Sequence, residues 1–415
     1  MKKISFFART LAIPTLALVM ITNSCQRDNT PAPAGGTFTP SAGARQFAVK
    51  TNDFSFDFLK NVNQLEKKDK NIFISPLSLH MALGMLLNGA NGKTAEEMRK
   101  TLKLDEVSAQ DANEVYKQLL EGLPKADPKV TTKLANAIFY RNDFSVEPDF
   151  LNLSRNYFSA QVAAEDFSNQ AAALAKINRW ASDNTNGKIP TVLTEITRDQ
   201  VMFLLNALYF KGDWKIPFDP KATYDAPFQI TGDQQKTVKM MNLNTNLRRA
   251  YRQNYSAVEL PYGDGTYRMT VLLPATNSSA DALVQSLNAT EWAQLQQSMT
   301  EGKTMVGLPK FTLEYEKNLN DELKAMGMPT AFSQFADFSK ISKSNGLAVS
   351  FVKQNTFVAV DEKGTEAAAV TTIGVELTSV GPAPIICDRP FVVLITEQQT
   401  GAVLFMGKIV NPESK

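Results

Sequence analysis

Alternating side chains mark one stretch late in the chain, residues 365–376, whose conformation the pattern leaves open. One parity holds only small, β-branched or apolar residues: Thr365, Ala367, Ala369, Thr371, Ile373 and Val375. The other parity includes Glu366 and Glu376. Because successive side chains of a strand point to opposite faces, a strand here would bury the first set and expose both glutamates. No proline interrupts residues 365–381, yet alanine is a poor strand former, so the stretch can pair without being obliged to.

Helical periodicity dominates the first half of the chain. Apolar residues recur at helical spacing from Phe47 to Leu65. Ser75-Pro76 supplies an N-cap and a first-turn proline for a helix that stops at Gly89. Residues 94–97 have the pattern of a capping box and predict the start of another helix. Further amphipathic segments lie at 111–120, 148–158 and 169–183.

Strand patterns follow in the second half. Residues 201–210 form a nearly continuous apolar run, which suits a strand covered on both faces. Other predicted strands are 71–74, 258–260, 267–273, 305–315, 349–360, 391–396 and 402–409, the last two joined by a turn at 399–401. A helix-rich half followed by a strand-rich half predicts an α+β fold. No linker divides residues 46–415, so we expect one domain there.

The N-terminal residues 1–24 have the features of an export signal. A positive start precedes an apolar core, 11–21, that is too short to span a bilayer stably. Small residues then precede Cys25, which resembles a bacterial lipoprotein cleavage box with Thr22 in place of the common leucine. We expect Cys25 to be lipidated, the alternative being a plain secretory signal with an incidental cysteine. Residues 25–45 are rich in Pro, Gly, Ala, Ser and Thr and predict a flexible tether.

Composition narrows the function classes. The net charge of +2, without a Lys/Arg block, argues against a nucleic-acid partner. The single histidine, His80, excludes multi-histidine metal sites, and no G-x-S-x-G elbow is present. A surface hydrolase would need a nucleophile paired with a base, and only His80 is available, on an apolar helix where packing is the expected role. We therefore expect no catalytic residue, no cofactor and no metal.

Six motifs along residues 46–413 resemble the serpin family of serine protease inhibitors. In family order they are NIFISPLS at 71–78, NALYFKGDW at 206–214, LPKF at 308–311, ADFS at 336–339, DEKGTEAAA at 361–369, and DRPF at 388–391 continuing to Gly407. Any one of them would be weak evidence, whereas six in order are specific. The resemblance implies three β-sheets, eight to nine helices and an exposed reactive loop at about 362–384.

The resemblance also implies an activity, which is suicide inhibition. A serine protease cleaves the loop and is held as an acyl-enzyme while the loop inserts as a new strand in the main sheet. The hinge that enters first consists of Glu362, Gly364, Thr365, Glu366, Ala367, Ala368 and Ala369. Non-inhibitory serpins often carry bulky, charged or proline residues there, so the small residues favour an inhibitor. The alternative is a non-inhibitory serpin used for binding or chaperoning.

The position of the scissile bond follows from the family's spacing. Counting forward from Gly364 places it at Thr378–Ser379, whereas counting back from Pro390-Phe391 places it one residue later; Leu377–Thr378 and Ser379–Val380 are rivals. A threonine with apolar neighbours suits an elastase-like protease, with subtilisin-like and cysteine proteases as further candidates. No Arg or Lys lies between residues 365 and 382, which argues against trypsin-like targets.

Two groups of residues match the region where the family's main sheet opens. We call Ser75, Ser78, Asn206 and Gln354 the shutter group; Gln354 stands where the family commonly has a histidine. We call Trp214, Lys310 and Glu362 the breach group, in which Lys310 and Glu362 match an ion pair. Cys387 is expected to be structural. We expect an exported monomer, lipid-anchored to the bacterial outer membrane on its periplasmic or outer side, with the membrane contacted only through that anchor.

Overall fold

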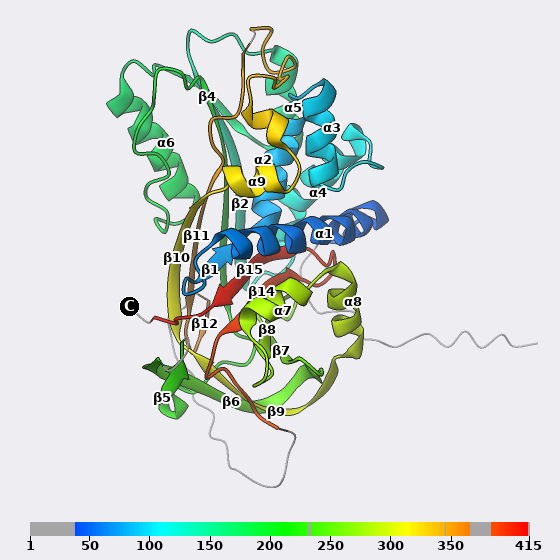
Figure 1. The fold of residues 1–415 in the computed structure, drawn as a ribbon, viewed down its shortest axis with the longest axis vertical. Coiled ribbons are helices and arrows are strands. Elements are labelled where there is room, and N and C mark those ends of the chain that lie inside the picture. Colours follow the sequence, from blue (N-terminus) through cyan, green and yellow to red (C-terminus); the bar gives the residue numbers. More distant parts are fainter. Residues whose placement is uncertain (1–37, 231–233, 345, 366–382, 414–415) are drawn as a thin grey trace, which may run out of the picture. The chain divides into compact units, whose positions relative to one another are not determined.

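Helices prevail up to residue 184 and strands after it, as the sequence predicts (Figure 1). The computed structural model describes residues 38–230, 234–344, 346–365 and 383–413. In this part of the chain the α-helices are α1 (Ala42–Leu65), α2 (Pro76–Leu87), α3 (Gly92–Thr101), α4 (Ala109–Gly122), α5 (Pro148–Phe158), α6 (Gln170–Asn184), α7 (Ala280–Ser286), α8 (Ala289–Ser298) and α9 (Asn320–Ala325). Short 3-10 turns occur at Leu123–Lys125, Pro220–Ala222 and Pro329–Phe332.

The larger strand network contains nine strands. Its order is β1 (Ile72–Ile74), β15 (Val403–Ile409), β14 (Phe391–Glu397), β8 (Tyr267–Pro274), β7 (Tyr255–Pro261), β6 (Gln235–Tyr251), β9 (Thr300–Pro309) and β13 (Ile385–Ile386), with β5 (Tyr224–Gln229) also paired to β6. The long strand β6 pairs first with β5 and β9, and only its last residues, 249–251, pair with β7. Two sheets therefore share β6, and the six-stranded sheet makes the third sheet that the family resemblance implied.

The six-stranded sheet is the one that the site belongs to. Its order is β10 (Phe311–Asn318), β11 (Lys353–Val360), β12 (Gly364–Thr365), β4 (Met202–Asp213), β2 (Val130–Arg141) and β3 (Gln161–Glu165). Helix α6 covers one face of β2 and β4, and α2 lies on the other face (Figure 1). We call these the outer face and the inner face.

Two apolar clusters fill the spaces on either side of this sheet. The main core joins α1 and α2 to the fully buried strands β14 and β15. A smaller cluster lies on the outer face, where Ile177 and Trp180 of α6 pack with Phe139 of β2 and Phe203 of β4. The described residues belong to one compact unit.

Several element boundaries differ from the sequence predictions. Helix α1 begins at Ala42, so the last residues of the predicted tether, 42–45, are helical. The predicted capping box at 94–97 is wrong, because α3 already begins at Gly92 after Asn91. Thr94 instead accepts a hydrogen bond from the backbone of Asp337 at 2.9 Å, and Glu97 binds Thr330. The side chains of Thr94 and Glu97, which would have formed the capping box, make tertiary hydrogen bonds instead.

Two predicted strands also change. The prediction of one strand over 305–315 is wrong, because the chain passes from the nine-stranded network to the six-stranded sheet at Lys310. The predicted strand 349–360 begins only at Lys353. The run 201–210 does form the strand β4, but several of its residues are half-buried rather than covered on both faces. These residues are only half-buried because a cavity lies beside β4.

Candidate functional site

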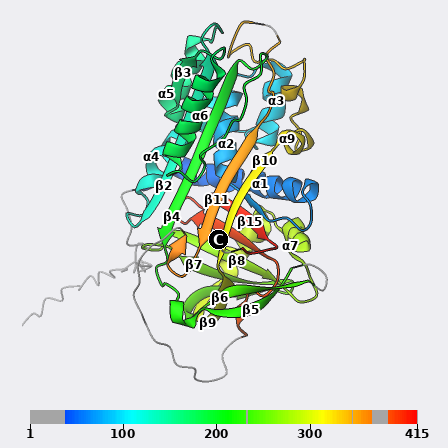
Figure 2. The same ribbon diagram turned by 90° about the vertical axis from the view of Figure 1, so that its left-hand side faces the viewer.

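A gap separates the two long central strands of the six-stranded sheet. The described part of strand β12, Gly364–Thr365, lies between β11 and β4. Its Thr365 is opposite Val360 of β11 and Gly212 of β4. Among the described residues no pairing joins β4 to β11 directly, and none of these residues forms a strand between the two beyond Thr365 (Figure 2).

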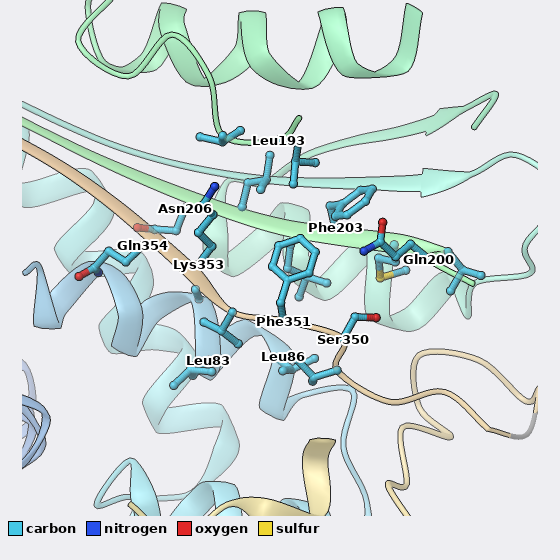
Figure 3. A pocket seen from close by; sticks show the side chains of 18 of the residues that line it. Leu83, Leu86, Leu193, Gln200, Phe203, Asn206, Ser350, Phe351, Lys353 and Gln354 are labelled. Carbon is cyan, nitrogen blue, oxygen red and sulfur yellow. The ribbon is translucent and has the colours of Figure 1, made fainter. Parts of the chain in front are cut away.

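A cavity of about 460 Å³ occupies the far part of this gap (Figure 3). Its walls are residues 202–207 of β4 and the segment 346–355 that leads into β11. Helix α2 contributes Leu83 and Leu86, and α6 contributes Trp180. The walls are mostly apolar side chains, with Asn206 and Gln354 at the end where α2 begins and Gln200 and Ser350 at the other end. A space of this size and lining can take up either an extended segment of chain or a mostly apolar small molecule.

The shutter group lies where α2 begins and links this helix to β11. Ser75 caps α2, because its hydroxyl accepts a hydrogen bond from the Ser78 amide and donates one to the Leu404 carbonyl, 2.8 Å away. The Gln354 side chain bonds the Ser75 backbone twice, accepting from its N–H at 3.0 Å and donating to its carbonyl at 2.8 Å. The uncharged side-chain amide of Gln354 thus links β11 to the start of α2.

The same helix is also linked to β4. The Ser78 hydroxyl donates to Oδ1 of Asn206, and the Asn206 amide donates to Oδ1 of Asn136 in β2 at 2.7 Å. Asn136 in turn donates to the Phe158 carbonyl at 2.7 Å. The four shutter residues therefore come together across the inner face, and α2 is the bridge between the two separated strands. Asn136 was not predicted as a site residue, although an asparagine within the apolar pattern of residues 134–140 was a signal.

His80 lies deeper on α2 and outside this network. Its Nε2 is 3.0 Å from the Leu102 carbonyl, and its Nδ1 is 2.8 Å from the Tyr116 hydroxyl. Phe47 and Phe54 contact the ring edge-on. Burial lowers the pKa of His80 to about 4, so the ring is neutral at pH 7. These contacts agree with the packing role expected from the sequence.

At the other end of the gap, aromatic residues hold β12. The Trp214 backbone N–H donates to the Lys363 carbonyl at 2.6 Å, and its indole N–H donates to the Asp361 carbonyl at 2.9 Å. The indole stacks on Tyr262 with ring centroids 4.4 Å apart. The Tyr262 hydroxyl is 2.6 Å from the Thr365 hydroxyl on the inner face. Tyr262 was missed, because nothing local in its sequence indicates a contact with the loop root.

The expected ion pair of the breach group is present. Nζ of Lys310 lies 2.8 Å from Glu362, and the Thr223 hydroxyl donates to the other carboxylate oxygen at 2.9 Å. Burial opposes ionisation of Glu362, but the hydrogen bonds from Lys310 and Thr223 outweigh it and hold the pKa of this carboxyl below its usual range. The carboxylate is therefore charged at pH 7 and restrains the root of the loop.

Gly364 allows β12 to approach β4 very closely. A Cβ at this position would lie 2.1 Å from the Gly212 carbonyl oxygen and 2.7 Å from the Asp213 Cα. These are backbone atoms, which cannot rotate away as a side chain can. Only glycine can therefore start the strand at this point.

Other predicted site residues lie outside the described residues. These are Glu366, Ala367, Ala368 and Ala369 of the hinge, Thr378 and Ser379 of the scissile bond, and Cys25. Their roles stay predictions. Cys387 is described and buried, and burial raises the pKa of its thiol well above the usual range. A structural role fits this environment.

Within the described ranges, no group of His, Cys, Asp and Glu side chains is arranged to hold a metal ion. None of the helices in those ranges combines the length and the apolar character that a membrane span needs.

Comparisons with known proteins agree with this geometry. The model of the family described as "Serpin (serine protease inhibitor)" matches residues 49–412. Leukocyte elastase inhibitor of Xenopus laevis is 36% identical over 373 residues, which cover 86% of this chain and 97% of that protein. Human neuroserpin is 31% identical over 363 residues, covering 84% and 87% of the two chains.

Two solved structures are also similar. Human thyroxine-binding globulin, complexed with its ligand, superposes with a TM-score of 0.82 at 30% identity and covers 90% of this chain and all (100%) of that chain. The thermophilic serpin tengpin in its native state gives a TM-score of 0.81 at 31% identity, covering 88% of this chain and 94% of its own.

Proposed function

The chain belongs to the serpin family, and from this premise we propose that it inhibits a serine protease as a suicide substrate. The observation that carries the proposal is the gap between β4 and β11, with Thr365 already paired to both strands at one end. A segment that continued from Thr365 in the same register would complete the sheet. Each added ladder hydrogen bond contributes about 1 kcal/mol, and burial of small apolar side chains adds to it.

The chemistry needs no catalytic group from this chain. The serine of the protease attacks the carbonyl carbon of Thr378, an ester to Thr378 forms, and the amino group of Ser379 leaves. The freed loop then enters the gap at about 3.3 Å per residue, and about fifteen residues carry the acyl-enzyme about 50 Å. Insertion that is faster than deacylation traps the protease, whereas slower insertion makes the protein an ordinary substrate.

The loop sequence favours an elastase-like target. Thr378 lies between Leu377 and Ser379, and a shallow apolar pocket accepts a side chain of this size. The similarity to a leukocyte elastase inhibitor supports the same class. Subtilisin-like and cysteine proteases are the next candidates. The rival bonds, Leu377–Thr378 and Ser379–Val380, would suit the same enzymes.

The test uses pancreatic elastase as the probe. Mixing it with the protein should give a covalent complex that survives SDS and boiling, together with a released C-terminal fragment. Mass spectrometry of that fragment should show Ser379 at its N-terminus. A fragment without any covalent complex, across elastase-like, subtilisin-like and cysteine proteases, would overturn inhibition.

A second candidate is a non-inhibitory serpin that binds a ligand or chaperones a partner. The observation in its favour is the similarity to thyroxine-binding globulin. Thermal unfolding before and after cleavage of the loop separates the two candidates. An inhibitor should become far more heat-stable after cleavage, because the loop completes the sheet, whereas an unchanged transition favours the binding protein.

We propose further that the protein is an exported bacterial lipoprotein, held at the outer membrane through Cys25 and otherwise monomeric. The signal-like residues 1–24 and the tether after them support this location. Two or more acyl chains anchor a protein durably. Radiolabelled palmitate should enter the wild type and not Cys25→Ser; equal labelling of both would contradict lipidation at this residue.

A further inference from the structure

The cavity beside β4 is bounded by elements from both faces of the six-stranded sheet. Leu83 and Leu86 of α2 close it on the inner face, and Trp180 of α6 closes it on the outer face. All three side chains are buried. The cavity volume of about 460 Å³ lies within the range of about 300–1,000 Å³ that small-molecule sites have. The space is therefore large enough for a drug-sized molecule.

Aromatic rings form a large part of the cavity wall. Phe203 of β4 and Phe351, which precedes β11, have ring centroids 6.0 Å apart and lie side by side in Figure 3. Trp180, Phe144 and Phe338 also line the cavity. Aromatic side chains contact another ring edge-on or in an offset stack, with centroids about 4.5–7 Å apart. This wall therefore favours an aromatic ligand.

The cavity offers little to balance a charge on a ligand. Among the described residues of its wall, only Asp199 and Lys353 are charged. Asp199 is exposed, and Nζ of Lys353 lies 2.7 Å from the Glu316 carboxylate, which already neutralises it. An ionised ligand would lose its hydration and find no partner charge in the wall, which is costly. The ligand that fits this lining is uncharged.

Gln200 supplies a hydrogen-bond donor at one end of the cavity. Its Oε1 accepts a hydrogen bond from the Thr197 N–H at 2.9 Å, which orients the side-chain amide. Figure 3 shows its amide nitrogen on the side of Phe203 and Phe351, and no other described residue accepts a hydrogen bond from this nitrogen. The polar side chains at the other end are engaged in the shutter group. A ligand therefore needs an acceptor oxygen at the end where Gln200 lies.

We propose that this cavity binds an uncharged aromatic molecule that carries a carbonyl or ether oxygen. The rings of Phe203, Phe351 and Trp180 contact its ring system, and the Gln200 amide donates a hydrogen bond to its oxygen. The site goes beyond the proposed function, because binding requires neither the reactive loop nor a protease. Failure of either proposal therefore leaves the other standing.

The first experiment titrates the full-length, uncleaved protein with prodan, an uncharged naphthalene with one ketone oxygen. Its emission shifts to the blue in apolar surroundings, and the shift should saturate at one probe per chain. Anilinonaphthalene sulfonate, an aromatic probe of similar size with a negative charge, is the matched control and should bind about tenfold more weakly or worse. No saturable binding of prodan, or equal affinity for the sulfonate, would overturn the site.

A second experiment locates the probe by filling the cavity. Leu205 lines the cavity from β4, so Leu205→Trp should weaken prodan binding about tenfold or more. Leu134→Trp is the matched control, because Leu134 is also half-buried in the same sheet, on β2, but does not line the cavity. This control should bind prodan with an affinity within about twofold of the wild type. An equal loss in both variants, or no loss in Leu205→Trp, would overturn the location.

A third experiment tests the donor. Gln200→Leu keeps the size of the side chain but removes its N–H groups, so the affinity for prodan should fall about fivefold. Dimethylaminonaphthalene, which lacks the ketone, should bind equally to wild type and variant. Equal weakening of both probes, or unchanged binding of prodan, would overturn the proposed hydrogen bond and the ligand class with it. This variant leaves the core intact and tests the proposal even if Leu205→Trp does not fold.

Discussion

The strands β14 and β15 differ from β4 in how completely their neighbours cover them. Every residue of β14 and β15 is buried, and β14 pairs on both sides. Strand β4 is equally apolar in sequence, yet many of its residues are half-buried beside the gap. The first region is a completed core, and the second retains a position for one more strand. The difference teaches that, under the proposed function, the six-stranded sheet can take up a strand while the main core stays intact.

The strongest test of this contrast is Thr365→Arg. Thr365 is 3% exposed between the two strands, so a guanidinium there would be buried without a partner. Formation of the SDS-stable elastase complex should fall about 100-fold or more, while cleavage of the loop continues. Lys363→Arg, which keeps its charge at the neighbouring turn, is the control. A Thr365→Arg variant that still traps the protease would remove the hinge argument.

The contrast between the two regions can be measured by truncating one leucine in each. Leu394→Ala in β14 removes a fully buried side chain and should cost about 2–5 kcal/mol. Leu205→Ala in β4 enlarges an existing cavity and should cost about 1 kcal/mol or less. Urea unfolding followed by far-UV circular dichroism gives both values. Equal losses would mean that β4 is as firmly packed as the core.

Acid should weaken the side of the sheet held by α2. His80 has a folded-state pKa of about 4, below the ordinary 6.5. Between these two pH values the imidazole is protonated in the unfolded chain but neutral in the folded protein. The stabilisation from neutral His80 is thus complete above pH 6.5 and is lost as pH falls to 4, by about 3 kcal/mol. Measuring the free energy of unfolding of wild type and His80→Gln at pH 7 and at pH 4 isolates the contribution of His80. The same pH dependence in both proteins would contradict this prediction.

A small effect, similar to that of Leu205→Ala, is expected from Tyr262→Phe at the loop root. This variant keeps the stacking on Trp214 but removes the hydrogen bond to Thr365, which is worth about 1 kcal/mol. The melting temperature of the uncleaved protein should fall slightly, and that of the cleaved protein should fall by a similar amount. A large loss in the uncleaved form alone would show that this bond holds the loop out of the sheet.

Local chemistry predicted part of the molecule well. The cap at Ser75, the helix over 148–158 and the apolar strand near 201–210 follow from short patterns. The wrong predictions concern positions where contacts with distant parts of the chain determine the structure. Thr94 binds Asp337 instead of capping a helix. At Lys310 one apolar run is divided between two sheets.

The candidate site shows the same division. Motif spacing predicted the shutter and breach residues except Gln354, since each of the others lies in one of the six motifs; Gln354 was assigned by its alignment with the family's common histidine. Tyr262, Asn136 and the contact between Phe203 and Phe351 depend on pairing between segments far apart in the chain, which no local pattern encodes. The register of β12, by contrast, becomes informative only once the strands on either side are known.

The distribution of tryptophan gives the gap its own spectroscopic signal. Of the three tryptophans, Trp214 stacks on Tyr262 at the loop root and Trp180 lines the cavity, while Trp292 packs against Phe56 elsewhere. Indole emission depends on the polarity and the aromatic neighbours of its surroundings. Tryptophan fluorescence of a Trp292→Phe protein therefore comes from the two indoles beside the gap, and its change after mixing with a protease, once the emission of the protease alone is subtracted, follows the loop over time.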